Sequence, residues 1–376
     1  MSNDTQPEIR FPGFTEAWEE RRLQEVVDRY DNLRIPITAS KRVAGNTPYY
    51  GANGIQGYVE GYTHDGEFIL VAEDGANDLK NYPVQYVDGK VWVNNHAHVI
   101  QAKENLADNM FLMNAIRSIN IEPFLVGGGR AKLNADVLMK LEVIIPLKSE
   151  QQKIGAFFKQ LDDTIALHQR KLDLLKETKK GFLQKMFPKN GAKVPEIRFP
   201  GFTEDWEERR LQEVVDRYDN LRIPITASKR VAGNTPYYGA NGIQGYVEGY
   251  THDGEFILVA EDGANDLKNY PVQYVDGKVW VNNHAHVIQA KENLADNMFL
   301  MNAIRSINIE PFLVGGGRAK LNADVLMKLE VIIPLKSEQQ KIGNFFKQLD
   351  DTITLHQRKL DLLKETKKGF LQKMFV

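Results

Sequence analysis

The chain contains one sequence twice. Pro7–Phe187 and Pro195–Phe375 align without a gap at a constant offset of 188 positions, and three aligned pairs differ. These pairs are Ala17 and Asp205, Ala156 and Asn344, and Ala166 and Thr354. A period this long indicates a duplicated domain, because solenoid repeats are roughly 20 to 50 residues long. The near-identity indicates a recent duplication, a recombination product or an engineered fusion. Both repeats must present the same surface, so we expect any ligand to be bound twice.

Composition excludes several classes of protein. The 376 residues are 42% hydrophobic and 26% charged, which is typical of a globular protein with sizeable cores. No apolar run reaches the roughly 18 residues of a membrane span, and the N-terminus lacks the features of a secretory signal. The absence of cysteine excludes disulfides, a thiol nucleophile and cysteine-based metal sites. These features predict a cytoplasmic protein that makes no membrane contact.

Charge is distributed unevenly along each repeat. Residues 7–148 and 195–336 are net acidic, whereas residues 149–187 and 337–375 are net basic. A protein that binds DNA unaided usually carries a basic surface. If this chain binds DNA, a local patch or a partner protein must therefore supply the phosphate contacts.

The first part of each repeat is predicted to be rich in strands. In the first repeat, strands are expected at residues 68–72 and 141–146 and a helix at 111–119. The segment 84–93 has an Asp-Gly dipeptide at its centre, which predicts a type I′ hairpin whose second strand continues toward Ile100.

The last part of each repeat predicts one long helix. The sequence Ser-Glu-Gln-Gln at 149–152 matches a capping box with Ser149 at the N-cap. Apolar residues then alternate at spacings of four and three, as in a coiled coil. The residues expected to pair the helices or bind a partner are Leu161, Ile165, Leu172, Leu175 and Phe182, with Leu349, Ile353, Leu360, Leu363 and Phe370. A second apolar set predicts that the helix buries more than one face, and it consists of Phe157, Leu167, Leu174 and Leu183.

Three segments of each repeat closely resemble the specificity (S) subunits of type I restriction-modification systems. They read Phe-Pro-Gly-Phe-Thr-Glu-x-Trp-Glu at 11–19, Lys-Leu-Asn…Ile-Pro-Leu…Glu-Gln-Gln-Lys-Ile-Gly within 132–155, and Gly-Phe-Leu-Gln-Lys-Met-Phe at 181–187. Their second copies lie at 199–207, 320–343 and 369–375, so the resemblance covers essentially the whole chain.

The resemblance implies two target recognition domains, each reading half of a bipartite site in double-stranded DNA. It also implies that two long helices set the gap between the half-sites and bind two modification (M) subunits, and that restriction (R) subunits can join the complex. Methylation, with S-adenosylmethionine as cofactor, and cleavage would reside in those partners. No catalytic residue, cofactor or metal site is therefore expected in this chain.

The expected fold class is α+β. Two strand-rich, mixed α/β recognition domains would be separated by two long antiparallel coiled-coil helices, with pseudo-two-fold symmetry. The expected boundaries are 1–148 for the first recognition domain, 149–187 for its helix, 188–194 for a linker, 195–336 for the second recognition domain and 337–376 for its helix. In this family the two recognition domains usually differ. Here they are nearly identical, so we expect an interrupted palindrome as the target.

Residues for DNA contact are chosen by their chemistry, because the resemblance does not fix them. Amide, guanidinium and ammonium groups can read base edges, and cations or backbone N–H groups can bind phosphates. The candidates are Lys41, Arg42, Tyr49, Tyr50, Asn53, Asn94, Asn95, His96, Arg130 and Lys132, with the copies Lys229, Arg230, Tyr237, Tyr238, Asn241, Asn282, Asn283, His284, Arg318 and Lys320. Gln56 has similar chemistry. For each candidate the alternative is an ordinary surface or turn residue.

Two other functions remain as alternatives. Asp74, Asp78 and Lys80 are spaced as in some magnesium-dependent nucleases, but such spacing is common by chance. The motifs of adenine methyltransferases, dinucleotide-binding sites and serine hydrolases are missing, so intrinsic catalysis is not expected. The second alternative is a non-catalytic coiled-coil scaffold whose globular domains bind protein.

Overall fold

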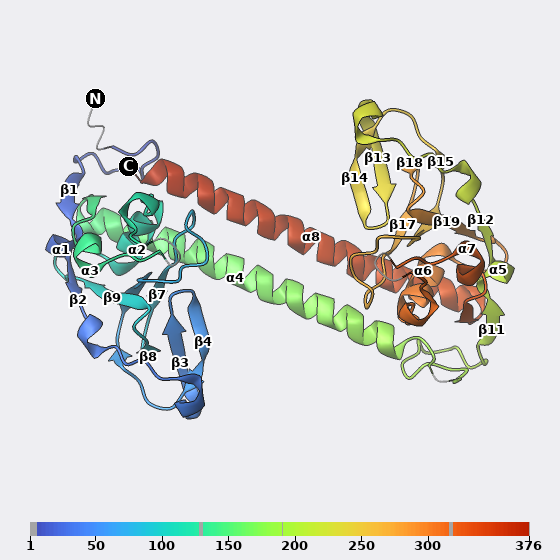
Figure 1. The fold of residues 1–376 in the computed structure, drawn as a ribbon, viewed down its shortest axis with the longest axis horizontal. Coiled ribbons are helices and arrows are strands. Elements are labelled where there is room, and N and C mark those ends of the chain that lie inside the picture. Colours follow the sequence, from blue (N-terminus) through green and yellow to red (C-terminus); the bar gives the residue numbers. More distant parts are fainter. Residues whose placement is uncertain (1–5, 128–130, 190, 316–318, 376) are drawn as a thin grey trace. The chain divides into compact units, whose positions relative to one another are not determined.

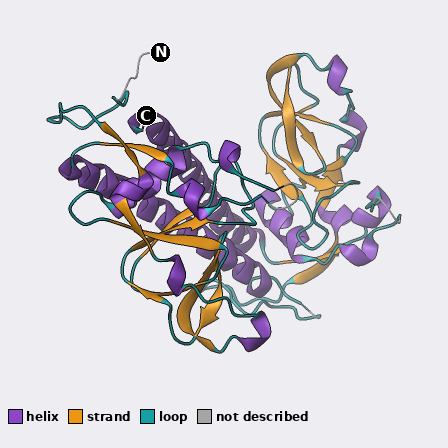
Figure 2. Cartoon of the chain, turned by 60° about the vertical axis from the view of Figure 1, so that its left-hand side comes forward, coloured by secondary structure: helices purple, strands orange, loops and turns teal. Residues whose placement is uncertain are grey.

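The computed structural model describes residues 6–127, 131–189, 191–315 and 319–375, and it divides into two compact units (Figure 1). Unit 1 comprises Met1–Gln169 and Arg358–Val376, and unit 2 comprises Arg170–Gln357. Each unit therefore holds the globular part of one repeat, the beginning of that repeat's long helix and the end of the other repeat's long helix. Both units mix helices and strands (Figure 2), which confirms the expected α+β class.

Three sheets form the described part of unit 1. The first is antiparallel, in the order β2 (Val27–Arg29), β9 (Ala97–Ala102), β6 (Phe68–Ala72) and β7 (Val84–Val87). The second has the order β4 (Gly54–Val59), β3 (Ala44–Gly51), β8 (Lys90–Val93) and β5 (His64–Asp65), with β3 parallel to β8. The third pairs β1 (Glu19–Arg22) with β10 (Glu142–Ile145), where a final strand was predicted.

The predicted hairpin at residues 84–93 is wrong. Strand β7 pairs with β6, whereas β8 pairs with β3 and β5, so the Asp-Gly turn passes the chain from one sheet to the next. Gly89 adopts the positive φ of +83° that such a turn requires. Val87 and Val91 enter one small hydrophobic cluster that both sheets share. Burial of these side chains between the two sheets thus outweighs pairing of β7 with β8. Strand β8 also ends at Val93 and does not continue into β9.

Short helices cover the sheets. The predicted helix forms as α2 (Asn109–Ser118), whose cap Asp108 accepts a hydrogen bond from the Phe111 amide at 2.8 Å. The remaining short elements are α1 (Leu23–Val26), α3 (Ala135–Leu138), η1 (Asp31–Leu33), η2 (Ala39–Lys41) and η3 (Glu122–Phe124).

The long helices are α4 (Lys148–Lys185) and α8 (Lys336–Met374). Ser149 lies inside the first turn of α4 and not at its N-cap, which corrects the capping-box prediction. The amides of Glu150 and Gln151 bond to the Leu147 carbonyl at 2.9 and 3.0 Å. The Glu150 side chain is engaged by Arg10, so tertiary contacts and not a local box fix this end of the helix.

Within unit 1 the segments of α4 and α8 run antiparallel. The rings of Phe157 and Phe370 lie 5.0 Å apart, and farther along α4 Asp162 pairs with Lys367, which comes earlier in α8. The second apolar set is only partly buried, because Leu167 and Leu174 are 61% and 67% exposed. Among the predicted pairing residues, Leu172 and Leu360 are buried and the others are half-buried, namely Leu161, Ile165, Leu175, Phe182, Leu349, Ile353, Leu363 and Phe370.

The end of each long helix enters the core of the other repeat's unit. Met374 and Phe375 belong to the main hydrophobic core of unit 1, and Met186 and Phe187 belong to that of unit 2. The unit 1 core also contains Phe111 of α2. Helix ends and globular domains are therefore packed as one body within each unit.

Unit 2 repeats the strand orders of unit 1. Its elements are β11 (Glu207–Arg210), α5 (Leu211–Val214), β12 (Val215–Arg217), η4 (Asp219–Leu221), η5 (Ala227–Lys229), β13 (Ala232–Gly239), β14 (Gly242–Val247), β15 (His252–Asp253), β16 (Phe256–Ala260), β17 (Val272–Val275), β18 (Lys278–Val281), β19 (Ala285–Ala290), α6 (Asn297–Ser306), η6 (Glu310–Phe312), α7 (Ala323–Leu326) and β20 (Glu330–Ile333). Across the described ranges, no helix is both long and apolar enough for a membrane crossing.

Candidate nucleic-acid interface

A polar pocket in unit 1 gathers many of the residues predicted to contact DNA. Its volume is about 620 Å3. It is lined by Pro36, Ile37, Thr38, Arg42, Tyr49, Ala52, Asn53, Gln56, Asp74, Gly75, Asn94, Asn95 and His96, and we call it the reading pocket. These residues come from β3, β4, the turn between them and the loops that follow η1, η2, β6 and β8.

Arg42 and Tyr49 form one wall of the reading pocket. The Arg42 guanidinium lies 4.0 Å from the centroid of the Tyr49 ring, and its Nε donates to the Ile37 carbonyl at 3.2 Å. The Tyr49 hydroxyl accepts from the Ile37 amide at 3.2 Å, and Tyr49 is 1% exposed. Tyr49 therefore supports Arg42, a cation that lines the reading pocket.

Two of the predicted asparagines hold loops in place. Asn53 donates to the Gly75 carbonyl at 2.9 Å and accepts from the Asn77 amide at 2.9 Å. Asn94 is 3% exposed, and its side-chain oxygen accepts from the His96 amide at 2.8 Å. Both polar atoms of the Asn53 amide and the side-chain oxygen of Asn94 are thus used within the protein, where they shape the pocket.

Asn95 and Gln56 present their amides to solvent at the same pocket. Within the described part of the chain, neither side chain forms a hydrogen bond. Gly51 lets Gln56 take this position, because a Cβ there would lie 2.2 Å from Gln56 Nε2. An amide that offers both a donor and an acceptor can read the edge of a base.

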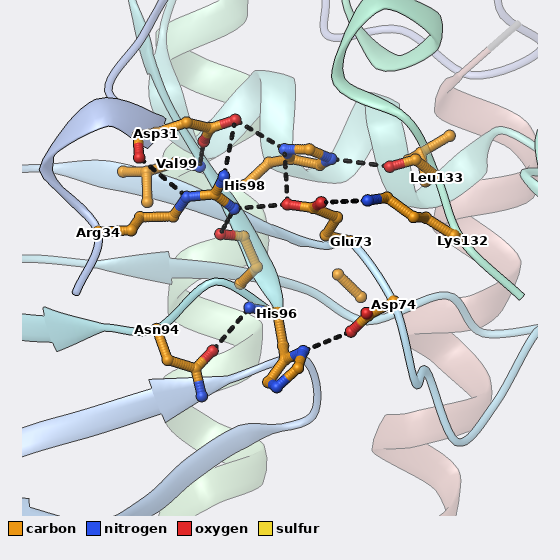
Figure 3. Close-up of polar contacts among 12 residues, drawn as sticks. Asp31, Arg34, Glu73, Asp74, Asn94, His96, His98, Val99, Lys132 and Leu133 are labelled. Carbon is orange, nitrogen blue, oxygen red and sulfur yellow. Dashed lines mark hydrogen bonds and ion pairs between the residues drawn. The ribbon is translucent and has the colours of Figure 1, made fainter. Parts of the chain in front are cut away.

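His96 lies beside an acidic residue. Its Nδ1 contacts Asp74 Oδ1 (Figure 3), at a distance of 2.5 Å. The His96 side chain is 33% exposed. Asp74 comes from the loop after β6, whereas His96 precedes β9, so this contact ties two pocket loops together.

A polar cluster around the buried His98 lies next to the pocket residues Asp74, Asn94 and His96 (Figure 3). His98 is 1% exposed, and its Nδ1 and Nε2 lie 2.8 Å from Asp31 Oδ2 and from the Leu133 carbonyl. Arg34 donates to Glu73 at 2.6 Å and to the Ala97 carbonyl at 2.8 Å. The cluster fixes η1 to β9, and β9 to the backbone at Leu133.

Electrostatics keep the acids of this cluster ionised. Burial raises the pKa of Asp31, but hydrogen bonds from His98 and the Val99 amide outweigh it, so the pKa lies below its ordinary value. Burial likewise raises the pKa of Glu73, and hydrogen bonds from Lys132 and Arg34 more than reverse the effect. Charged, paired groups of this kind make a rigid support.

The other predicted DNA contacts lie outside the reading pocket. Lys41 is exposed in η2, and Tyr50 is half-buried against the small cluster between the sheets. Lys132 pairs with Glu73 at 2.9 Å. Arg130 and its copy Arg318 lie outside the described residues.

Unit 2 repeats these contacts in detail. Arg230 lies 4.0 Å from the centroid of Tyr237, and His284 Nδ1 lies 2.5 Å from Asp262. The remaining predicted residues occupy the positions of their first-repeat counterparts, and these are Lys229, Tyr238, Asn241, Asn282, Asn283 and Lys320.

The nuclease-like spacing of Asp74, Asp78 and Lys80 does not produce a shared site. The Asp78 carboxylate accepts from the Lys80 and Asn81 amides at 3.0 and 2.9 Å, and Asp74 pairs with His96. Among the residues that the structure describes, no group of three or more His, Asp and Glu side chains is arranged to hold a metal ion.

The sequence did not indicate the polar cluster that supports the reading pocket. Asp31 and His98 are 67 positions apart, and Arg34 and Glu73 are 39 apart, so no local motif links them. Gly51 was also missed. Its only signal is its place in the Gly-, Asn- and Tyr-rich stretch 49–57, which predicts tight turns and close backbone approach.

Comparisons with known proteins agree with one another. A family model of the type I restriction modification DNA specificity domain matches residues 15–177 and again 203–365. The chain is 51% identical over 132 residues to a Haemophilus influenzae protein provisionally named as a type I restriction enzyme specificity subunit. That match covers 35% of this chain and 34% of the relative, so the chain spans about a third of the relative's length.

Two further relatives match over almost their whole length. The MjaVIII type I restriction enzyme specificity subunit of Methanocaldococcus jannaschii is 20% identical, with 95% of this chain and 91% of that protein covered. The crystal structure of the S subunit of a type I restriction-modification system from M. genitalium has a TM-score of 0.78 at 15% identity, with 99% of each chain covered. That structure is similar to this chain in fold.

Proposed function

Because the chain belongs to the family of type I restriction modification DNA specificity domains, we propose that its two repeats read two inverted copies of one DNA half-site. The target would then be an interrupted palindrome. Methylation, with its cofactor S-adenosylmethionine, and cleavage would be carried out by partner M and R subunits, and this chain would catalyse neither reaction.

The observation that carries this proposal is the identity of the two reading pockets. Every pocket residue of unit 1 has an identical counterpart in unit 2, and Arg42 and Arg230 stack on their tyrosines at the same 4.0 Å. Identical donors and acceptors select identical base edges. The contact between Phe157 and Phe370 in unit 1 has an equivalent in unit 2 with the repeats exchanged, as in a symmetric dimer. There, Phe345 contacts Phe182. In the proposal, the two repeats read opposite strands of the target.

Methylation mapping tests the proposal. The chain is co-expressed with its M subunit in a methylation-free host, and modified adenines are located by sequencing. We expect every modified site to contain one half-site and its inverted copy at a fixed gap. Two unrelated half-sites would refute the palindrome. A chain that gives no sequence-specific binding in mobility-shift assays, with or without M subunits, would instead favour a protein-binding scaffold.

The long helices offer a surface for the M subunits. Leu167 and Leu174 on α4, and Leu355 and Leu362 on α8, are between 61% and 67% exposed. Exposed leucines spaced one heptad apart suit a helix-packing partner. Replacing Leu174 and Leu362 with Glu should abolish co-purification of the M subunit while the far-ultraviolet circular dichroism stays unchanged. Replacement of the exposed Lys171 and Lys359 with Gln is the control and should retain the M subunit.

A further inference from the structure

A second pocket adjoins the reading pocket and reaches a long helix. In unit 1 this pocket has a volume of about 670 Å3 and runs along Tyr82–Gln85 and Arg117 to Leu371 of α8. Asn53 lines both this pocket and the reading pocket, so the two are neighbours. Asn77, Asn81 and Gln85 also line this second pocket. We call it the helix groove.

Unit 2 has the same groove, with a volume of about 530 Å3. It contains the counterparts of Asn81, Tyr82–Gln85, Arg117 and Leu371, and α4 borders it with Lys176, Lys179 and Lys180. The equivalent lysines of α8 in unit 1 are Lys364, Lys367 and Lys368.

In unit 2 the groove is lined by four cations, Lys176, Lys179, Lys180 and Arg305, and by one acid, Glu177. Lys179 pairs with Asp350, and Arg305 Nη1 lies 3.4 Å from the same carboxylate. Two cations therefore share one carboxylate. Burial lowers the pKa of Lys179, and the nearby Arg305 charge lowers it further, as expected for a site with surplus positive charge.

In unit 1, Arg117 and Lys367 likewise share Asp162, and Asp78 also lines the groove. Arg117 donates Nε and Nη2 to the Val84 carbonyl at 3.0 and 2.7 Å, whereas its buried Nη1 has no hydrogen-bond partner within the described structure. The ion pair between Arg117 Nη1 and Asp162 is long, at 3.6 Å, so this nitrogen keeps hydrogen-bonding capacity for an anionic acceptor.

The mouth of the groove carries further cations. Lys176 and Lys180 are exposed and lie one helical turn apart, and neither makes an ion pair with any residue in the described ranges. The globular part of each repeat is net acidic and its long helix is net basic. The helix end can thus supply the positive charge that the globular domain lacks.

We propose that the helix groove binds the phosphate backbone of the DNA whose bases enter the adjoining reading pocket. The end of each long helix then provides phosphate contacts for the domain of the other repeat. This inference rests on the proposed function. The four exposed lysines, Lys176 and Lys180 with Lys364 and Lys368, make the main contacts, because a flexible ammonium group binds a phosphate without reading sequence.

The test measures the salt dependence of DNA binding by the chain assembled with its M subunits. The variants are K176A/K180A, K364A/K368A and the combination of all four. Each phosphate contact contributes about 0.9 to the slope of log K against log salt. We expect the slope to fall in two equal steps of about 1.8, one for each pair, while the preference for the target over unrelated DNA stays constant. The matched control, K171A/K359A, removes exposed lysines that line neither pocket.

The outcomes separate this inference from the function on which it rests. If the wild-type complex shows no sequence preference, both fall. If the wild-type complex is specific and the lysine variants behave like K171A/K359A, only the groove assignment is overturned. Loss of M-subunit co-purification with an unchanged slope would also overturn it, because the lysines would then bind an acidic protein surface.

Discussion

The ring of Phe375 lies 5.3 Å from the ring of Phe111, although the two residues belong to different repeats. Phe187 has the same relation to Phe299, at 5.5 Å. Phe375 and Phe187 are only 8% and 4% exposed. The last turn of each long helix therefore closes the core of the other repeat's domain, and neither repeat contains a complete core of its own.

Residues 1–190, expressed alone, should form a homodimer. Phe187 and Met186 would enter the domain of a second copy, where Phe111 lies in the position that Phe299 holds in the full chain. Sedimentation equilibrium measures the mass directly. We expect a dimer that dissociates only as the fragment unfolds, because each core needs the partner's helix end.

A Phe187→Ala fragment provides the matched test. Truncation of a buried phenylalanine typically costs about 3–5 kcal/mol, so this fragment should be far less stable and largely monomeric. Leu174→Ala, at an exposed position, should leave the dimer intact. A fragment of residues 1–190 that is a stable monomer would contradict the shared core.

Arg10 and Glu150 should behave as a coupled pair. Arg10 Nε and Nη2 each donate to the Glu150 carboxylate at 2.7 Å, and the two side chains are 15% and 0% exposed. Arg10→Ala leaves a buried carboxylate without a partner and should cost about 3–5 kcal/mol of the free energy of unfolding. Glu150→Ala should cost less, because the remaining cation can reach solvent.

Urea unfolding of the two single variants and of the double variant measures this coupling. We expect the double variant to lose much less than the sum of the single losses. Strict additivity would show that the two residues contribute independently. Arg198→Ala should reproduce the Arg10 effect, since Arg198 binds Glu338 at 2.8 Å.

Protonation of Asp31 and its copy Asp219 at low pH should lower the free energy of unfolding. The folded pKa of each carboxyl is lowered below its ordinary value of 3.8. The unfolded chain therefore takes up protons first as the pH falls. The stabilisation from these groups is present above about pH 4 and is lost as the pH falls through the folded pKa.

Asp31→Asn with Asp219→Asn should reduce the stability at neutral pH and flatten its decline below about pH 4. Thermal or urea unfolding between pH 2.5 and 7 provides the profile. Asp28→Asn, at an exposed site, serves as the control and should keep the wild-type profile. If the double variant loses as much stability at low pH as the wild type does, these two carboxyls do not cause that loss.

The fold could be predicted where the signal is local. The heptad spacing predicted α4, and the apolar pattern predicted α2 and β10. The Asp-Gly turn was found, but its strands separate because Val87 and Val91 are buried between two sheets, and a turn dipeptide carries no information on that choice. For the candidate site, donor chemistry selected Arg42 and Asn95. It could not tell that Tyr49 is buried or that Asn53 and Asn94 are already engaged, because those contacts join separate loops.

Asn95 offers the sharpest test of base reading, because the chain carries a second copy at Asn283. Asn95→Ala alone should relax recognition at one half-site and leave the other intact, whereas Asn95→Ala with Asn283→Ala should relax both. An amide that bonds a base edge at two points discriminates by about 1–3 kcal/mol, so methylation of sites with one altered base pair should rise about 5- to 150-fold.

The measurement is methylation of one substrate with the altered base pair in one half of the site and of another with it in both halves. For the proposed palindrome, the single variant should methylate the first substrate only, whereas the double variant should methylate both. Glu104→Gln, exposed and outside the reading pocket, is the control. Asn95 does not read bases if the double variant keeps the wild-type preference at every position. A loss of methylation on all substrates would instead assign Asn95 to a phosphate contact, which weakens binding uniformly.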